Sequence, residues 1–387
     1  MSWSSVKIEK LCSKVVSGGT PSTKKDDYYG GNIPWLRTQE VNFVPIDRTE
    51  LTISELGLKN SSAKWVPANT VIVAMYGATA GRSAITKIPL TTNQACCNLI
   101  VNPDVADYRF LYYSLVFHFK ELESLAHGSA QTNLSLGVIK VFEISCPILS
   151  TQTQIANILS AYDDLIENNR RRIALLEEAA RKLYKAWFVK RRFPGWESVP
   201  VGGDGLPQEV EFGTFVQFLR GKVITKRDAV EDGGIPVVAA GMAPAYFTDK
   251  SNVLWPSVTV SASGANAGYV WLHLDDIWAS DCSFISRKET PWVYFIYLYL
   301  QTRQEALKGM QKGAAQPHVH ATDIAKLRFF RPSEELLKAF TDTVSPFFLQ
   351  IRVLLNQNRL LAQSRDKLLP KLMSGELSVE NIALPTA

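Results

Sequence analysis

The feature that most constrains this chain is an internal repeat at a spacing of 185 residues. The segment GSAQTNLSLGVIKVFEISCP begins at Gly128, and it matches GAAQPHVHATDIAKLRFFRP, which begins at Gly313. Upstream, TVIVAMYGATAG (70–81) matches SVTVSASGANAG (257–268) more loosely. A repeat of this length indicates one structural unit that is present twice, in two diverged copies.

Each copy ends in a long helical pattern that follows a proline. Apolar residues recur there at alternating steps of four and three, which is the spacing of a coiled-coil seam. In the first copy the seam is Ile155, Leu159, Tyr162, Ile166, Asn169, Ile173, Leu176, Ala180, Leu183 and Trp187. In the second copy it is Phe340, Val344, Phe347, Ile351, Leu354, Asn358, Leu361, Arg365, Leu368 and Leu372. A helix of about 36 residues spans roughly 54 Å, and its apolar seam needs a partner.

The two long helices are the simplest partners for each other. Two copies related by a pseudo-two-fold axis would pair these helices as an antiparallel coiled coil, with one globular domain near each end. If Asn169 faces Asn358, the axis falls at about residue 171, near the middle of the first helix. Buried Asn pairs fix the register of paired helices, so we predict that these two residues meet; the alternative is coincidence. The predicted pairing residues are Asn169, Leu176, Leu183, Asn358, Leu361 and Leu368.

The repeat also predicts the domain boundaries. Short β-rich runs with Gly and Pro turns, together with a few helices such as 107–124, favour an α+β fold in each globular domain. Gly and Pro residues end the first helix. The predicted segments are a first domain (1–150), a first long helix (151–192), a Gly/Pro linker (193–208), a second domain (209–332), a second long helix (333–375) and a C-terminal tail (376–387).

Composition narrows the class of protein. The apolar run WVYFIYLYL (292–300) is about half the roughly 20 residues that a membrane-spanning helix needs. The N-terminus lacks the apolar stretch of a signal peptide, and the five cysteines form no C-x-x-C pair. We therefore expect a cytoplasmic, reduced protein with no bound metal and no membrane partner.

Charge is concentrated in the first long helix. Residues 165–192 hold nine Lys and Arg against three Glu, whereas the net charge of the whole chain is only +5. Binding to nucleic acid would therefore depend on local patches. The clusters Arg170–Arg172 and Arg181, Lys182 and Lys185 lie mostly off the seam, where they could contact an acidic partner or DNA phosphates, or simply form a solvated helix face.

Two similar domains held apart by a rigid rod favour a protein that reads two separated sites. Successive accessible major grooves on one face of DNA lie about 34 Å apart, a distance that a helix of this length can bridge. Because the two copies have diverged, the two half-sites would differ. The expected target is an asymmetric, bipartite sequence in double-stranded DNA.

The chain resembles the specificity subunits of type I restriction–modification systems over nearly its whole length. The resemblance rests on GGTPSTKKDDYYGGNIPWLRTQEV (18–41), NQACCNL (93–99), QTQIANILSAYDDLIENNRRRIALLEEAARKLYKAWF (152–188) and QNRLLAQSRDKLLPKLMSGEL (357–377). It implies a non-catalytic chain with two target-recognition domains, each reading half of a bipartite DNA sequence. It further implies paired helices that set the spacer and bind two adenine-methyltransferase (M) subunits, which restriction/translocase (R) subunits can join. S-adenosylmethionine, ATP and Mg²⁺ would then bind to those partners and not to this chain.

Sequence-specific reading requires directed donors and acceptors on exposed loops, although the alternative for each loop is a solvated turn. Four loops of the first domain supply such side chains. They are Thr20, Ser22, Lys24, Lys25, Arg37, Thr38, Gln39, Tyr76, Thr79, Arg82, Gln131 and Asn133. The matching places of the second domain supply Arg220, Lys222, Thr225, Lys226, Arg227, Ser263, Asn266, Gln316 and His318.

Signatures of catalysis are missing from the sequence. The chain has no G-x-x-x-x-G-K-[ST] phosphate loop and no H-E-x-x-H zinc motif. A thiol nucleophile at Cys96 or Cys97, with His118 or His127 as base, is the best enzyme alternative, but QACCNLIV reads as a buried strand. The remaining alternative is a coiled-coil scaffold that binds proteins, which a weak dependence of DNA affinity on salt would favour.

Overall fold

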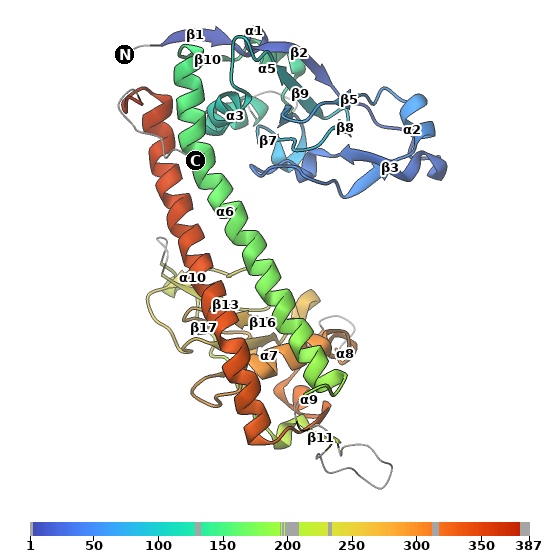
Figure 1. Cartoon of the computed structure of the whole chain (residues 1–387), viewed down its shortest axis with the longest axis vertical. Helices are drawn as coiled ribbons and strands as arrows, with labels where there is room; N and C mark the ends of the chain where they lie inside the picture. Colours follow the sequence, from blue (N-terminus) through green and yellow to red (C-terminus); the bar gives the residue numbers. More distant parts are fainter. Residues whose placement is uncertain are drawn as a thin grey trace. The chain divides into compact units, whose positions relative to one another are not determined.

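The computed structural model describes residues 3–127, 133–193, 195, 197, 209–230, 234–311 and 317–379. The chain forms two compact units: Met1–Glu167 with Arg359–Ala387, and Asn168–Asn358. Each unit combines a globular region with part of each long helix, α6 (Leu149–Tyr184) and α10 (Glu334–Met373), which Figure 1 draws in green and red. Most of the predicted linker and the end of the predicted tail lie outside the described residues.

The first globular region runs from β1 (Ser4–Lys7) to β10 (Glu143–Cys146), and these two strands pair antiparallel at its root. Two four-stranded sheets follow, with the orders β2-β9-β6-β7 and β4-β3-β8-β5. Their strands are β2 (Cys12–Ser17), β3 (Tyr29–Leu36), β4 (Leu51–Ile53), β5 (Trp65–Val66), β6 (Val71–Ala74), β7 (Ser83–Ile85), β8 (Leu90–Thr92) and β9 (Cys96–Val101). The helical elements are α1 (Ile8–Leu11), η1 (Asp26–Tyr28), η2 (Thr38–Glu40), α2 (Glu55–Lys59), η3 (Gly77–Thr79), α3 (Tyr108–Phe117), α4 (Phe119–His127) and α5 (Leu136–Val141).

Strand β6 shows why the sequence reads as a continuous apolar run there. Successive side chains of a strand point to opposite faces of the sheet. Val71 and Val73 enter the buried cluster that contains Phe110 of α3, whereas Ile72 and Ala74 enter a second cluster. Both faces of this strand are therefore buried, and the run contains no alternating polar residue.

The second globular region repeats this plan. It begins and ends with the antiparallel pair β11 (Glu209–Glu211) and β19 (Arg328–Phe330), and its four-stranded sheet β12-β18-β15-β16 matches β2-β9-β6-β7. The other strands are β12 (Leu219–Arg220), β13 (Ile235–Val238), β14 (Phe247–Thr248), β15 (Ser257–Ser261), β16 (Val270–His273), β17 (Trp278–Ala279) and β18 (Cys282–Ser286). The helical elements are η6 (Phe212–Thr214), η7 (Lys226–Asp228), η8 (Gly264–Asn266), α7 (Val293–Thr302), α8 (Gln304–Gly309) and α9 (Ala321–Ala325).

The helical seams occupy the positions predicted from the sequence. Every predicted seam residue of α6 and α10, and Trp187 in the short π-helical segment η4 (Lys185–Val189), is buried or half-buried. In unit 1, Ile155 and Leu159 share a buried cluster with Leu372. In unit 2, Leu176 and Leu183 pack against the cluster that contains Phe340 and Val344. The apolar seam is thus the part of each helix that its unit buries.

Two local predictions have clear outcomes. Asn169 Nδ2 donates to Asn358 Oδ1 at 3.0 Å in unit 2, which confirms that these two residues meet. The predicted single helix over 107–124 is wrong, because α3 ends at Phe117, His118 caps it, and α4 starts at Phe119. The His118 amide donates to Ser114 O at 2.9 Å, which closes the last turn of α3. Within the described residues, no helix is both long and apolar enough to cross a membrane.

Candidate nucleic-acid interface

The loops predicted to read DNA in the first region meet at one edge of its sheets. Asn93 N donates to Leu36 O at 2.9 Å, Met75 N donates to Ala95 O at 2.9 Å, and Gly19 N donates to Thr92 O at 2.8 Å. These bonds join the loops that follow β2, β3, β6 and β8 to one another. We call this set of loops the first loop edge.

A glycine is required where each loop edge begins. A Cβ added to Gly18, directly after β2, would lie 2.1 Å from Thr92 O. A Cβ added to Gly221, directly after β12, would lie 2.1 Å from Ser280 O. Real Cβ atoms do not approach backbone oxygen this closely, so the chain can leave both strands in this way only through glycine.

Side chains also connect the predicted residues of the first loop edge. Thr79 Oγ1 donates to Thr38 O at 2.8 Å, so η3 is tied to η2. Tyr76 and Asn133 form an isolated antiparallel bridge, which brings the loop before α5 to the same place. Gln131 lies outside the described residues.

The donors of the first loop edge fall into two groups. Arg37 Nη2 is paired with the Glu50 carboxylate at 2.7 Å, and Gln39 Nε2 donates to the same carboxylate at 3.4 Å. Glu50 thus holds the Arg37 and Gln39 side chains in place. In contrast, Ser22 and Lys24 are exposed on their loop. The remaining predicted residues have the following contacts: Lys25 Nζ with Tyr28 Oη, Thr20 Oγ1 with Gln94 Oε1, and Arg82 Nη1 with Asn42 Oδ1.

A second loop edge occupies the equivalent place in unit 2. Gly221 N donates to Cys282 O at 2.8 Å, and Val319 N donates to Ala262 O at 3.0 Å. Ser263 and His318 form an isolated antiparallel bridge at the position of the Tyr76–Asn133 bridge. The repeat therefore extends to the loops: both copies assemble the same edge from the same strand ends.

The side chains on the second loop edge are different. Its cationic residues Arg220, Lys222, Lys226 and Arg227 are exposed. Thr225 Oγ1 donates to Asp228 at 2.8 Å, whereas Ser263 is 9% exposed and donates to the Asp281 carboxylate. Asn266 is half-buried in η8, the rings of His318 and His320 stack with centroids 5.9 Å apart, and Gln316 lies outside the described residues.

Reasoning from the sequence missed the acids on these edges. Glu50 holds Arg37, and Asp281 accepts from Ser263, but neither acid is among the predicted residues. One signal was available: Asp281 lies beside Cys282, which the 185-residue spacing aligns with Cys97 of the NQACCNL segment. Acids of this kind restrict the rotamers of the donors, which is how a base reader is held in one geometry.

The thiol-nucleophile alternative has poor support from the described residues. Cys96 and Cys97 are fully buried in β9, and burial raises the pKa of both thiols far above neutral pH. Nucleophilic cysteines need a lowered pKa and an accessible sulfur. His118 Nδ1 contacts Glu121 at 3.0 Å. These cysteines are therefore core residues of the first sheet.

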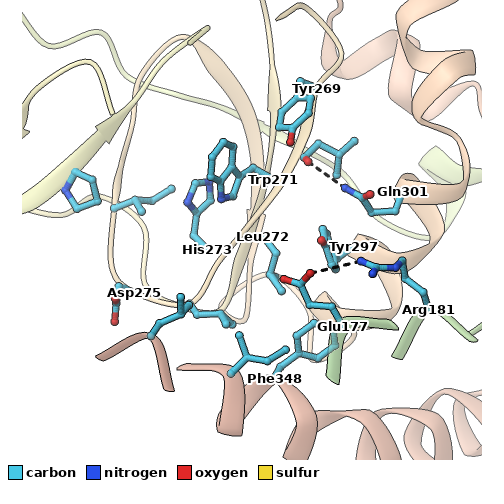
Figure 2. Close-up of a pocket in the computed structure, with 16 residues that line it drawn as sticks. Glu177, Arg181, Tyr269, Trp271, Leu272, His273, Asp275, Tyr297, Gln301 and Phe348 are labelled. Carbon is cyan, nitrogen blue, oxygen red and sulfur yellow. Dashed lines mark hydrogen bonds and ion pairs between the residues drawn. The ribbon is translucent and has the colours of Figure 1, made fainter. Parts of the chain in front are cut away.

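Unit 2 also contains a groove that the sequence did not predict (Figure 2). Trp271 and His273 alternate along β16, with their rings stacked at an interplanar angle of 10°, and Tyr269 directly precedes the strand. Together with Glu177, Arg181 and other residues they line a space of about 580 Å³. In the first region, strand β7 instead receives backbone bonds from residues 43 and 46, and its Ala84 is fully buried.

His273 in this groove predicts a pH dependence of stability. Burial lowers the pKa of His273 from 6.5 to about 4, and its Nε2 lies 2.8 Å from Thr259 Oγ1. Between those two pH values the unfolded chain binds a proton that the folded chain excludes. The contribution of neutral His273 to the free energy of unfolding is therefore intact above pH 6.5 and is lost as the pH falls toward 4. The loss is at most about 3 kcal/mol.

The test compares urea unfolding of the wild type and of His273→Gln at pH 7 and pH 4.5. Glutamine can keep a hydrogen bond to Thr259 but does not titrate, whereas all other acids are the same in both proteins. We expect the wild type to lose about 2 kcal/mol more stability than the variant over this range. Equal losses would show that His273 is protonated freely in the folded protein.

Comparison with known proteins agrees with the repeat. The family model described as "Type I restriction modification DNA specificity domain" matches residues 1–178 and again residues 208–361. The type I restriction enzyme MjaIX specificity subunit of Methanocaldococcus jannaschii is 29% identical over 414 residues, which cover 98% of this chain and 94% of that protein. A putative type I specificity subunit of Mycoplasma genitalium is 24% identical over 325 residues, covering 77% of this chain and 82% of that one.

A solved structure shows the same fold. The crystal structure of a type I restriction–modification S subunit from M. genitalium superimposes with a TM-score of 0.63 at 18% identity, and the match covers 96% of each chain. Both copies of the repeat thus fall within one family, and the fold agrees over nearly the whole length. The chain belongs to the family of type I restriction–modification DNA specificity subunits, and it supplies sequence specificity toward DNA.

Proposed function

We propose that the chain reads an asymmetric, bipartite sequence in double-stranded DNA, with one half-site bound by each globular region. The observation that carries this proposal is the duplicated loop edge. The same strand ends and bridges build both edges, yet the side chains on them differ. One scaffold with two different sets of donors is what recognition of two unlike half-sites requires. The individual base-reading residues stay predictions.

The spacer between the half-sites would be set by α6 and α10 paired as an antiparallel coiled coil. Contacts within each unit support this pairing. In unit 2, Phe340 near the start of α10 lies 6.0 Å from Tyr184 at the end of α6, ring centroid to ring centroid. Asn358 bonds Asn169 farther along, and in unit 1 Leu372 shares a cluster with Ile155. Positions later in α10 thus meet positions earlier in α6.

The outer face of α10 is suited to docking of a methyltransferase subunit. In unit 2, Leu349 and Val353 are 46% and 54% exposed. Their spacing of four residues places them on one helix face, away from the seam; we call them the docking stripe. Large exposed apolar residues in a row are typical of a surface that a partner covers. In this proposal the partners bind S-adenosylmethionine, ATP and Mg²⁺, and this chain carries no catalytic step.

The test maps adenine methylation in host DNA with and without the gene for this chain. We expect one asymmetric, gapped motif to be methylated only when the chain is present. Binding of purified protein to that motif should weaken steeply with salt, because several phosphates are neutralised. A methylation pattern that does not depend on the chain, together with DNA binding insensitive to salt, would exclude a DNA-reading role and favour a protein scaffold.

A further inference from the structure

The helical seam of unit 1 contains a charge that the repeat does not explain. Arg365 interrupts the apolar seam of α10, and in the structure its Nη1 donates to Asp163 Oδ1 of α6. The second oxygen of Asp163 accepts from the hydroxyl of Tyr113 on α3 at 2.6 Å. These three residues, which we call the ionic anchor, connect both long helices to the first globular region.

The ionic anchor is buried at Tyr113 and half-buried at its two charged residues. Tyr113 is 4% exposed, and the Asp163 and Arg365 side chains are 25% and 27% exposed. Burial and the Asp163 carboxylate raise the pKa of the Tyr113 hydroxyl, so it stays protonated and can donate. Arg365 also contacts Asp366 at 2.8 Å, so its charge is compensated on two sides. Charge-assisted bonds of this kind are short and strongly directional.

The second copy of the repeat uses different chemistry at the same place. At the 185-residue spacing Asp163 corresponds to Phe348, which stacks on Tyr294 of α7 with centroids 4.5 Å apart and an interplanar angle of 9°. Apolar contacts of this kind are not tied to one direction, as hydrogen bonds are. Among the described residues, the Tyr–Asp–Arg arrangement is therefore a feature of the first region. In unit 2, α10 is bound to the globular region by a different directional contact, from Arg352 Nε to Leu274 O at 2.6 Å.

Orientation matters because one base pair changes the geometry of the target. Each added base pair moves a half-site by about 3.4 Å and turns it by roughly 34° around the helix axis. A globular region that can rotate by a similar angle on its helices would accept targets whose spacer is one base pair shorter or longer. Restraint of the globular region on its helices is thus as necessary as the length of the rod.

We propose that Tyr113, Asp163 and Arg365 are positioning residues that hold the first globular region at one angle on its helices and so restrict the target to one spacer length. This inference rests on the bipartite reading proposed above. In this proposal two features determine which spacer length is accepted. One is the pair of long helices, and the other is the ionic anchor between these helices and the first globular region.

The experiment uses the full chain with its methyltransferase partners and a plasmid library in which the spacer of the mapped target varies by up to two base pairs. Methylation of each spacer is compared for the wild type, Tyr113→Phe, Asp163→Asn and Arg365→Gln. We expect the preference for the native spacer over its neighbours to fall about tenfold or more in the variants, which corresponds to about 1.4 kcal/mol. Base preferences within both half-sites should stay unchanged.

Two further variants separate positioning from folding. Arg365→Lys keeps the charge and should retain most of the spacer preference. Lys338→Gln removes an exposed ion pair on the same helix, in which Lys338 Nζ lies 2.9 Å from Asp342 Oδ2. This variant should behave as the wild type. An unchanged spacer preference, or an equal loss of methylation at all spacers, would overturn the proposal. A wild type without any gapped target would instead refute the bipartite function itself.

Discussion

Replacing Leu349 and Val353 with aspartate is expected to abolish methylation of the target while leaving the free chain folded. Both side chains are about half exposed, so the change removes little buried apolar surface within the chain. In the assembled complex, however, each carboxylate would be buried against the methyltransferase without a partner, which costs several kcal/mol. Because each 1.4 kcal/mol is a tenfold change, we expect affinity for that subunit to fall at least about 100-fold.

The measurement is co-purification and titration of the methyltransferase subunit against the variant, with thermal unfolding of the free chain as a check. Ala339→Asp with Thr343→Asp is the matched control, since it adds the same two charges four residues apart at exposed positions of α10 that do not neighbour Leu349 or Val353 on the helix surface. The control should assemble and methylate normally. Normal assembly of the stripe variant would place the docking surface elsewhere.

The fold could be predicted to a large extent because its main signals are periodic. The seam of α6 and α10 follows from steps of three and four residues, and the contact of Asn169 with Asn358 follows from the symmetry of the repeat. The apolar run of β6 reflects the burial of both its faces. Such patterns report burial, which depends on residue type and spacing alone.

The sites were less predictable because they depend on pairs that are distant in sequence. From the sequence, Arg365 could be identified only as an interruption of the seam, because its partner Asp163 is 202 residues away and lies off the predicted seam. Likewise, the groove lies beside β16, which receives from the described residues no backbone bonds like those that β7 receives from residues 43 and 46 in unit 1. Helix 107–124 was predicted as one element because its apolar pattern continues across the break at His118.

Exchanging the first globular region for that of a relative with a different target is expected to change one half of the methylated motif completely. The structure indicates where to cut. Strands β1 and β10 pair through Ser4–Cys146 and Lys7–Glu143, so the chain enters and leaves the region side by side. Boundaries before residue 4 and after residue 146 keep this ribbon intact and leave α6 whole. Tyr113 should be kept or restored, because Asp163 would otherwise lose a buried donor.

The same exchange between β11 and β19 provides the matched experiment in unit 2, and it should change the other half of the motif. Each chimera should keep the half-site read by its unchanged region, because the two loop edges belong to separate compact units. If one exchange altered both halves, the regions would not read DNA independently. If neither altered the motif in a chimera that folds and assembles, the bases would be read outside the loop edges, and the helices with their cluster at Arg170–Arg172 would become the first place to look.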